Sequence, residues 1–274
     1  MTLLLDKLTV YGEMLEAVMA MLPTEGDAVQ LPELRRQLFP LGSNPTTERE
    51  LLDYLTHTGL AALDYGGENL RAVWRDSSGV RLHLLRWLRQ ARDENGVVLA
   101  FYRFLLEERV SARRVLERDE VWPAFNRARK DSRDGVSVVA LNGPKTASWL
   151  RLLSFIGLVR PERSNSFVLF PSLALAKALV TWGGCRMPEG QKEVLSLARW
   201  VEAVEQEWCP VTTGPGILHA GWADSLECLS QRGVLAFQMH GDAAGVLVNG
   251  RLVSHVRLIA QSGVDDASPT ATVD

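Results

Sequence analysis

Apolar residues recur at spacings of three and four along much of the chain, which is the pattern of amphipathic helices. In the N-terminal part this spacing predicts helices over residues 3–22, over 31–39 and from Thr46 or Thr47 to Thr58. Two short apolar runs within residues 60–74, separated by a glycine pair, then predict a β-hairpin. The first 80 residues are therefore expected to form helix, helix, turn, helix and hairpin.

The pattern that ends the third predicted helix returns twice. Gly59, Gly157 and Gly233 each follow leucines that stand seven and four residues earlier, and each precedes an apolar strand. A glycine in the left-handed conformation ends a helix without strain, so it can turn a helix with one buried stripe into a strand. The second and third hairpins are predicted within 158–170 and 234–248, and a further strand over 252–259.

Helix, helix, tight turn, helix and hairpin is the order of a winged helix-turn-helix. The sequence therefore predicts a mainly α fold with small β-wings, built from tandem winged-helix modules joined by helical segments. The expected units are an N-terminal module (1–80), a helical connector (81–130), a central module (131–171), a second connector (172–208), a C-terminal winged-helix-like module (209–260) and a disordered polar tail (261–274).

Charge is divided unevenly along the chain, although the formal net charge is only −3. Residues 81–186 carry 19 Lys and Arg against 10 Asp and Glu, whereas residues 1–80 carry 6 against 12 and residues 187–274 carry 5 against 11. A basic centre is a hint of nucleic-acid binding, and its competing interpretation is an Arg-rich, solvated helical face. The acidic ends are better suited to contacts with protein.

The stretch Asn142-Gly143-Pro144-Lys145-Thr146 resembles part of a phosphate-binding loop, but its spacing does not fit one. Such a loop needs Gly and Lys to be adjacent and a second glycine five residues upstream, because backbone amides must surround the phosphates. Here Pro144 separates Gly143 from Lys145 and removes an amide donor, and Val138 stands at the upstream glycine position. ATP or GTP is therefore not expected as a ligand.

Residues 142–159 instead resemble the winged helix-turn-helix family, particularly its MarR-like pattern. In that pattern a Ser/Thr-rich turn leads into a helix that ends L-x-x-L-x-x-x-G-L-V, which is matched here by residues 150–159. The resemblance implies that side chains at the start of the helix contact base edges and that the wing contacts phosphates. It assigns Lys145, Thr146, Ser148 and Arg151 to the recognition helix and Arg160 and Arg163 to the wing. The apolar run Val136–Leu141 departs from the pattern, because the helix expected there would be short or replaced by a strand.

The basic residues around this module add a phosphate-contacting surface to the expectation, since neutralising phosphates supplies most of the affinity for DNA. They are Arg127, Arg129, Lys130, Arg133, Lys145, Arg151, Arg160 and Arg163. The other two presumed recognition helices carry acidic residues, Glu48, Glu50 and Asp53 in one and Asp224 and Glu227 in the other. Only the central module is therefore expected to bind double-stranded DNA.

The main functional hypothesis is a non-catalytic bacterial DNA-binding protein, regulatory or architectural within a multi-protein system such as defence or a mobile element. The alternative is a subunit similar to the tandem winged-helix partners of chromosome-organising or defence ATPases, in which the acidic modules bind protein and DNA contact is secondary. A replication initiator and a homodimer also remain open. A cytoplasmic, or nucleoid-associated, location is expected, because no signal peptide or apolar span occurs near the N-terminus.

Catalytic and metal-binding patterns are not recognised. The chain has no HExxH or GxSxG motif, and its three cysteines (Cys185, Cys209 and Cys228) form no CxxC pair, so they are expected to be buried, inert thiols. No metal or other cofactor is expected. Tryptophans such as Trp149, Trp200 and Trp222 could stack on bases, but at helical spacing they are more often part of a core.

Overall fold

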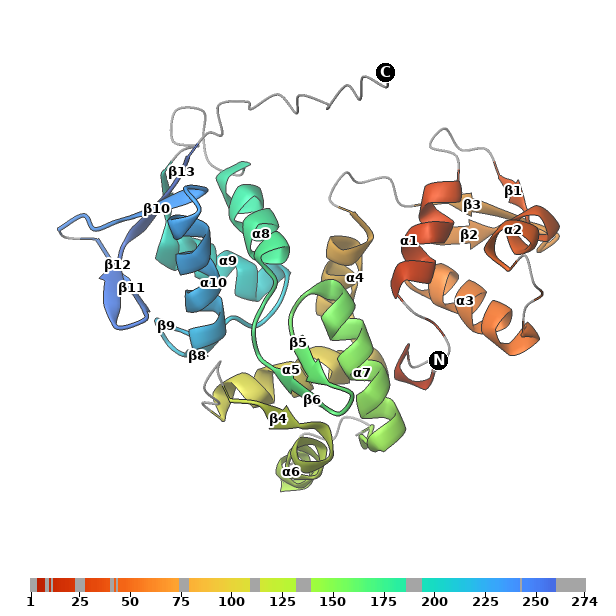
Figure 1. Cartoon of the computed structure of the whole chain (residues 1–274), viewed down its shortest axis with the longest axis horizontal. Coiled ribbons are helices and arrows are strands. Elements are labelled where there is room, and N and C mark those ends of the chain that lie inside the picture. Colours follow the sequence, from red (N-terminus) through yellow and green to blue (C-terminus); the bar gives the residue numbers. More distant parts are fainter. Residues whose placement is uncertain are drawn as a thin grey trace, which may run out of the picture.

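The protein is described by a computed structural model that covers residues 4–7, 10, 12–22, 28–39, 42, 44–73, 79–108, 114–131, 139–185, 194–241 and 243–259. For residues 130 and 131 it describes the backbone only. Helices predominate, and each of three helical groups carries a small sheet (Figure 1). The predicted mainly α fold with small β elements is thus confirmed. The predicted tail over 261–274 lies outside the described residues.

The chain contains three repeats of one order: helix, short strand, helix, helix and two further strands. The first repeat comprises α1 (Gly12–Met21), β1 (Val29–Gln30), α2 (Leu31–Leu38), α3 (Pro45–His57), β2 (Ala61–Leu63) and β3 (Asn69–Ala72). The second comprises α5 (Val97–Glu107), β4 (Leu116–Glu117), α6 (Arg118–Asp131), α7 (Gly143–Ile156), β5 (Arg160–Arg163) and β6 (Ser166–Val168). The third comprises α8 (Leu173–Cys185), β7 (Val194–Ser196), α9 (Leu197–Glu207), α10 (Ala220–Gln231), β10 (Leu235–Gln238) and β13 (His255–Leu258), with two strands inserted between α9 and α10 and two more between β10 and β13.

Strand order is also the same in the three repeats. The short first strand pairs antiparallel with the last strand, which gives the sheets β1-β3-β2, β4-β6-β5 and β7-β13-β10. In each repeat the first strand runs directly into the second helix. A short segment far upstream therefore closes each hairpin into a three-stranded sheet.

The glycine junctions recognised in the sequence have one geometry. Gly59, Gly157 and Gly233 have φ of 69°, 96° and 69°, in the left-handed region that favours glycine. After each of them, the next residue donates its N–H to the carbonyl of the leucine four positions before the glycine, at 2.9 to 3.0 Å. These leucines (Leu55, Leu153 and Leu229) are buried, so the cap and the apolar stripe form one unit.

The two segments predicted as connectors each contain a strand that pairs with a later hairpin. Residues 81–130 contain α5, β4 and α6, and β4 pairs with β6 of the second hairpin. Residues 172–208 likewise contain α8, β7 and α9, and β7 pairs with β13. The sheets β4-β6-β5 and β7-β13-β10 therefore each take a strand from a segment that is predicted as a connector. What joins the first two repeats is α4 (Gly79–Gln90) with the 3-10 turn η2 (Glu94–Gly96).

The third hairpin is also paired differently from the prediction. Residues 246–248 do not pair with β10, because β10 pairs with β13. Instead a hairpin of β11 (Val246–Val248) and β12 (Arg251–Val253) is inserted between them and joins β8 (Thr212–Gly214) and β9 (Ile217–Leu218) in a sheet of order β12-β11-β9-β8. This hairpin lies at the left edge of the molecule in Figure 1.

The helix predicted over residues 3–22 is interrupted. A 3-10 turn, η1 (Leu4–Asp6), precedes α1, which begins at Gly12. A Cβ atom at Gly12 would overlap the ring of Phe155 in α7. Glycine thus allows the start of α1 to approach Phe155 of α7 closely. The predicted N-cap of the third helix is wrong, because Asn44 caps α3 and accepts from the Thr46 N–H. Residues 40, 41 and 43 of the predicted turn lie outside the described residues.

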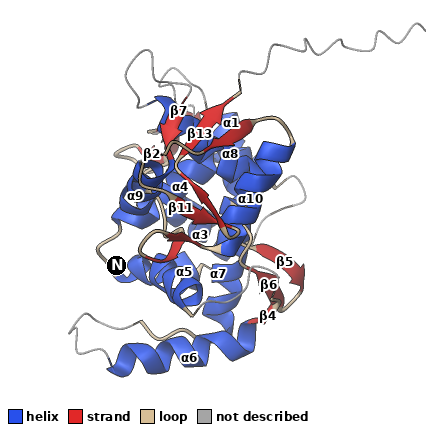
Figure 2. Cartoon of the chain, turned by 90° about the vertical axis from the view of Figure 1, so that its left-hand side faces the viewer, coloured by secondary structure: helices blue, strands red, loops and turns tan. Residues whose placement is uncertain are grey.

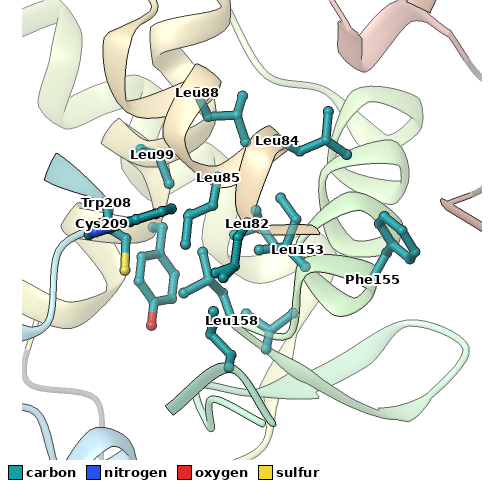
Figure 3. Packing of buried hydrophobic residues seen from close by; sticks show 14 of the residues in the cluster. Leu82, Leu84, Leu85, Leu88, Leu99, Leu153, Phe155, Leu158, Trp208 and Cys209 are labelled. Atoms are coloured by element: carbon teal, nitrogen blue, oxygen red, sulfur yellow. The ribbon is translucent and has the colours of Figure 1, made fainter. Parts of the chain in front are cut away.

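One continuous cluster of buried apolar side chains runs through all three repeats. Leucines of α4 pack toward Leu153 of α7 and toward Leu158, which comes directly after the glycine cap of that helix (Figure 3). The indole N–H of Trp149 donates to the Val98 carbonyl at 2.9 Å within the second repeat. The indole of Trp222 donates to the Tyr102 hydroxyl at 3.2 Å and so joins the third repeat to the second. Trp149, Trp200, Trp208 and Trp222 are buried, which confirms the core interpretation for them.

Candidate functional site

The stretch around Lys145 is the N-terminus of α7. Asn142 caps the helix: its side-chain oxygen accepts from the Lys145 N–H at 3.0 Å, and its carbonyl accepts from both the N–H and the hydroxyl of Thr146. Pro144 stands in the first turn, where a missing N–H does no harm. These amides are used within the chain, so they are not directed toward a phosphate.

Two of the predicted base-contacting residues are buried, which corrects that expectation. Thr146 is 0% exposed and Ser148 is 6% exposed. The Thr146 hydroxyl donates to the Asn142 carbonyl, and the Ser148 hydroxyl accepts from the Arg151 guanidinium at 3.1 Å. A side chain must reach the surface to contact a base edge, so neither residue is suited to that role here.

From Lys145 onward α7 is covered by neighbouring elements, not only at these two positions. It packs against η1, α1, α4, α6 and β5. Every residue from Lys145 through Val159 is buried or half-buried. A recognition helix enters the major groove with an open face. In this structure α7 is a core helix, although the sequence marked it as the element that reads DNA.

The two basic side chains of α7 are directed into the protein. Lys145 Nζ lies 3.5 Å from Asp6 Oδ1 in η1, and its side chain is 24% exposed. Arg151 is half-buried and lines a small recess beside Lys7 and Tyr54. Lys145 therefore helps to hold the N-terminal segment against α7.

The wing residues are more accessible. Every residue of β5 is exposed, including Arg160 and Arg163. Arg160 donates from Nε and Nη2 to one oxygen of Glu162, at 2.9 and 2.8 Å, and its guanidinium lies 5.1 Å from the Phe170 ring centroid. Arg163 forms no ion pair with another residue in the described ranges. Of the two arginines in the predicted wing, Arg163 alone has no ion-pair partner among the described residues.

The C-terminal half of α6 carries the remaining predicted contacts. Arg127 is exposed, and Arg129 is half-buried with its guanidinium 5.4 Å from the Phe125 ring centroid. The side chain of Lys130 and the whole of Arg133 lie outside the described parts. The helix runs along one side of the molecule (Figure 2). Its first turn carries Asp119 and Glu120, so the charge along α6 is mixed.

A hollow of about 370 Å³ lies where the start of α7 meets the wing. Its lining includes Arg118, Arg151 and Ser164. The Arg118 guanidinium donates to Asp119 at 3.1 Å, and the Arg118 backbone N–H donates to the Asn165 carbonyl between β5 and β6 at 2.8 Å. This hollow brings the predicted Arg151 close to the wing, but Arg127 and Arg129 do not line it.

A larger groove of about 510 Å³ lies between the second wing and α10. The wing contributes Arg160, Glu162, Val168 and Phe170, and α10 contributes Asp224, Glu227, Cys228 and Gln231, with Val115 beside them. Asp224 and Glu227 both accept from the Asn249 side-chain amide, at 2.8 and 2.7 Å. Their charge is therefore used partly to bind the tip of the β11–β12 hairpin.

The third repeat resembles the second in covering its third helix. Every residue of α10 from Gly221 through Ser230 is buried or half-buried. In α3, by contrast, Arg49 and Thr56 are exposed. Two acidic residues of α3 form ion pairs within the chain: Glu48 contacts Arg35 at 2.6 Å, and Asp53 contacts Lys7 at 2.7 Å.

Sequence reasoning missed a surface formed by Ile217, Leu247 and Leu252. They are 45%, 42% and 52% exposed and belong to β9, β11 and β12. The available signal was the run Val246-Leu247-Val248-Asn249-Gly250-Arg251-Leu252-Val253, in which Asn-Gly joins two alternating apolar strands. A hairpin over these residues was not predicted, because residues 245–248 were assigned to the third wing.

Buried titratable groups lie away from these surfaces. Burial raises the pKa of the Tyr102 hydroxyl and of the Cys209 thiol well above their usual ranges. Burial acts to raise the pKa of Glu205, but hydrogen bonds from Thr212 and Val211 and the contact with Arg103 outweigh it, and the pKa is lowered. Cys209 is buried as expected, whereas Cys228 is half-buried and Cys185 is exposed, so that prediction is wrong for the latter two.

In the described ranges no helix is long and apolar enough to cross a membrane. No protein-family model, curated protein or solved structure matches the chain.

Proposed function

We propose that the chain consists of three winged-helix modules and acts as a non-catalytic interaction subunit of a larger protein assembly. The module assignment is supported by the repeated element order and by the strand order, in which the short first strand flanks the last strand of each hairpin. The modules begin earlier than the sequence suggested, at α1, α5 and α8.

The observation that carries this proposal is the enclosure of α7. Residues 145–159 are all buried or half-buried, and Lys145 is paired with Asp6. A protein that used Lys145 to contact DNA would have to break its pair with Asp6 of η1 first. The winged-helix repeats therefore serve as a scaffold, and the exposed surfaces outside α7 are the ones available to partners.

Isolation of the intact assembly tests this role. A tagged full-length chain, expressed at its native level in its own host, is expected to elute with a second protein in fixed stoichiometry when size-exclusion chromatography is followed by light scattering. Co-purification with an ATPase would assign the complex to the chromosome-organising or defence class. Recovery of the chain only as a free monomer or homodimer would contradict the proposal.

DNA contact is a second candidate function, and the exposure of Arg127 and Arg163 favours it. Within the described chain neither residue has an ion-pair partner, and they lie on α6 and the second wing. This contact would be made with phosphates and would be independent of sequence.

Fluorescence anisotropy with a random duplex at low salt tests that candidate. Combined Arg127→Glu and Arg163→Glu substitutions are expected to weaken binding about tenfold or more and to flatten its salt dependence. Combined Arg49→Glu and Arg71→Glu substitutions, which make the same charge change at exposed residues of α3 and β3, are the matched control and should have a smaller effect. Equal losses from both proteins would mean that only net charge matters.

A further inference from the structure

A row of aliphatic side chains crosses the inserted sheet of the third repeat. Leu252 pairs with Leu247, and Leu247 pairs with Ile217, so the three residues lie side by side on adjacent strands. Their exposed fractions are 52%, 42% and 45%. Val246, Val248 and Val253 alternate with them and are buried on the opposite face. One face of this sheet thus closes the core and the other presents the row outward.

The row ends at a free sheet edge, because β12 is the outermost strand. Asn249 and Gly250, with φ of 46° and 81°, form a two-residue turn between Val248 and Arg251. In such a hairpin the residues flanking the turn exchange hydrogen bonds, and the backbone N–H and C=O of the next residue point outward. Leu252 therefore offers both its side chain and its backbone groups to a partner.

The hairpin is held in place at its turn and along the inner edge of β11. At the turn, Asn249 donates to Asp224 and Glu227 of α10. On its inner edge, the Leu247 N–H donates to the Gly216 carbonyl at 3.3 Å. A Cβ atom at Gly245 would lie 2.6 Å from Leu252 Cγ, so the chain passes directly against that side chain. The edge is consequently preorganised, which lowers the entropic cost of docking.

The size and charge of this surface indicate what it accepts. Three half-exposed aliphatic side chains supply far less apolar area than the roughly 800 Å² per partner of a standard stable interface, so a second copy of the chain is a poor occupant. An added strand gains its affinity from backbone hydrogen bonds as well. Arg251 is the sole charged residue of β11 and β12, and it is exposed without an ion pair to any described residue. It favours a carboxylate on the partner.

We propose that β12 and the row Ile217–Leu247–Leu252 dock an extended segment of a partner protein, which adds to the sheet as a further strand. The segment carries aliphatic residues at alternate positions and an acidic residue near Arg251. This inference rests on the proposed role as an interaction subunit and names the surface that performs it.

The test uses a random linear peptide library displayed on phage and the intact chain as bait. Peptides selected by the unmodified chain are expected to contain alternating aliphatic residues and an acidic residue. Combined Leu247→Lys and Leu252→Lys substitutions should reduce the affinity of the synthesised peptide about tenfold or more. Each of the two substitutions is also made singly and compared with Val73→Lys as the matched control, because Val73 is 52% exposed but lies in the first repeat.

Strand addition also predicts a pattern in the backbone hydrogen bonds of the peptide, which can be tested independently. Methylation of successive backbone nitrogens of the peptide should abolish binding at every second position only, and amide exchange at Leu252 should slow when the peptide binds. A loss of affinity without this period of two, or equal loss in the Val73→Lys protein, would overturn the proposal. So would the absence of any peptide that prefers the unmodified chain to the double variant.

The two proposals can fail separately. If the double variant still elutes with its native partner in full stoichiometry, the docking edge is refuted and the interaction subunit stands. If the unmodified chain has no partner at all, the proposed function itself fails.

Discussion

At the scale of single residues, Glu205 shows how one carboxylate organises a junction. One of its oxygens accepts from the N–H groups of Val211 and Thr212 and from the Thr212 hydroxyl, and the other accepts from Arg103 of α5 at 3.1 Å. It thereby fixes the chain between α9 and β8 and joins the third repeat to the second.

Glu205→Gln is expected to lower the free energy of unfolding at pH 7 by about 1–3 kcal/mol, because the charge-assisted bonds weaken. The folded-state pKa of Glu205 is lowered, so its stabilisation is present above the unfolded value of about 4.3 and is lost as pH falls through the folded pKa. Urea unfolding at several pH values should show the difference between the two proteins shrinking below about pH 4. Glu16→Gln, at a surface pair with Arg81, is the control and should cost under about 1 kcal/mol. A difference independent of pH would contradict this account.

The three capping glycines offer a second comparison between single residues. All three have positive φ, but only at Gly157 would a Cβ atom overlap a neighbour, the side chain of Ser172. Gly59→Ala and Gly233→Ala should each cost about 1–2 kcal/mol from backbone strain alone. Gly157→Ala should cost about 1–3 kcal/mol more, since the overlap must also be relieved. Chemical denaturation of the three variants measures this, and three equal losses would show that the contact at Ser172 relaxes freely.

At the scale of elements, the residue types that start and end helices were readable in the sequence, but the role of each helix was not. The leucine and glycine spacing marked the ends of α3, α7 and α10. Lys145 and Arg151 then suggested a DNA-reading surface on α7. Their surroundings come from η1 and α1, which lie far upstream, so the local pattern contained no sign that the helix is covered.

The β11–β12 hairpin illustrates how an element is held by its tip. Asn249→Gly keeps the turn, because glycine also adopts positive φ, and removes the amide that binds Asp224 and Glu227. We expect backbone amide exchange in β11 and β12 to become faster while exchange in the hairpin β2–β3 is unchanged. Hydrogen exchange read by mass spectrometry measures both segments. Unchanged exchange in β11 and β12 would mean that pairing with β9 alone fixes the hairpin.

At the scale of the whole molecule, the shared core couples the repeats. Leu5 in η1 is fully buried, and η1 packs on α7 of the second repeat. The Trp222 to Tyr102 hydrogen bond joins the third repeat to the second. The repeats are therefore parts of one folding unit rather than independent modules on connectors.

Leu5→Ala should consequently destabilise the entire chain, by about 2–5 kcal/mol. Tryptophan fluorescence, to which the buried Trp200 and Trp222 of the third repeat contribute, and far-ultraviolet circular dichroism should give one coincident transition, shifted to lower denaturant. An unshifted fluorescence transition would instead mean that the first repeat unfolds separately.

The sequence by itself determined the C-terminal ends of α3, α7 and α10, the three glycine junctions and the hairpins that follow Gly59 and Gly157, because these depend on spacing and backbone conformation within about fifteen residues. Tertiary structure alone decided that β4 and β7 close the second and third sheets, that β13 rather than β11 pairs with β10, and that α7 is enclosed. These features depend on contacts between distant segments, and side-chain exposure follows from such contacts. The charge of a helix could be counted from the sequence, but its access to a partner could not.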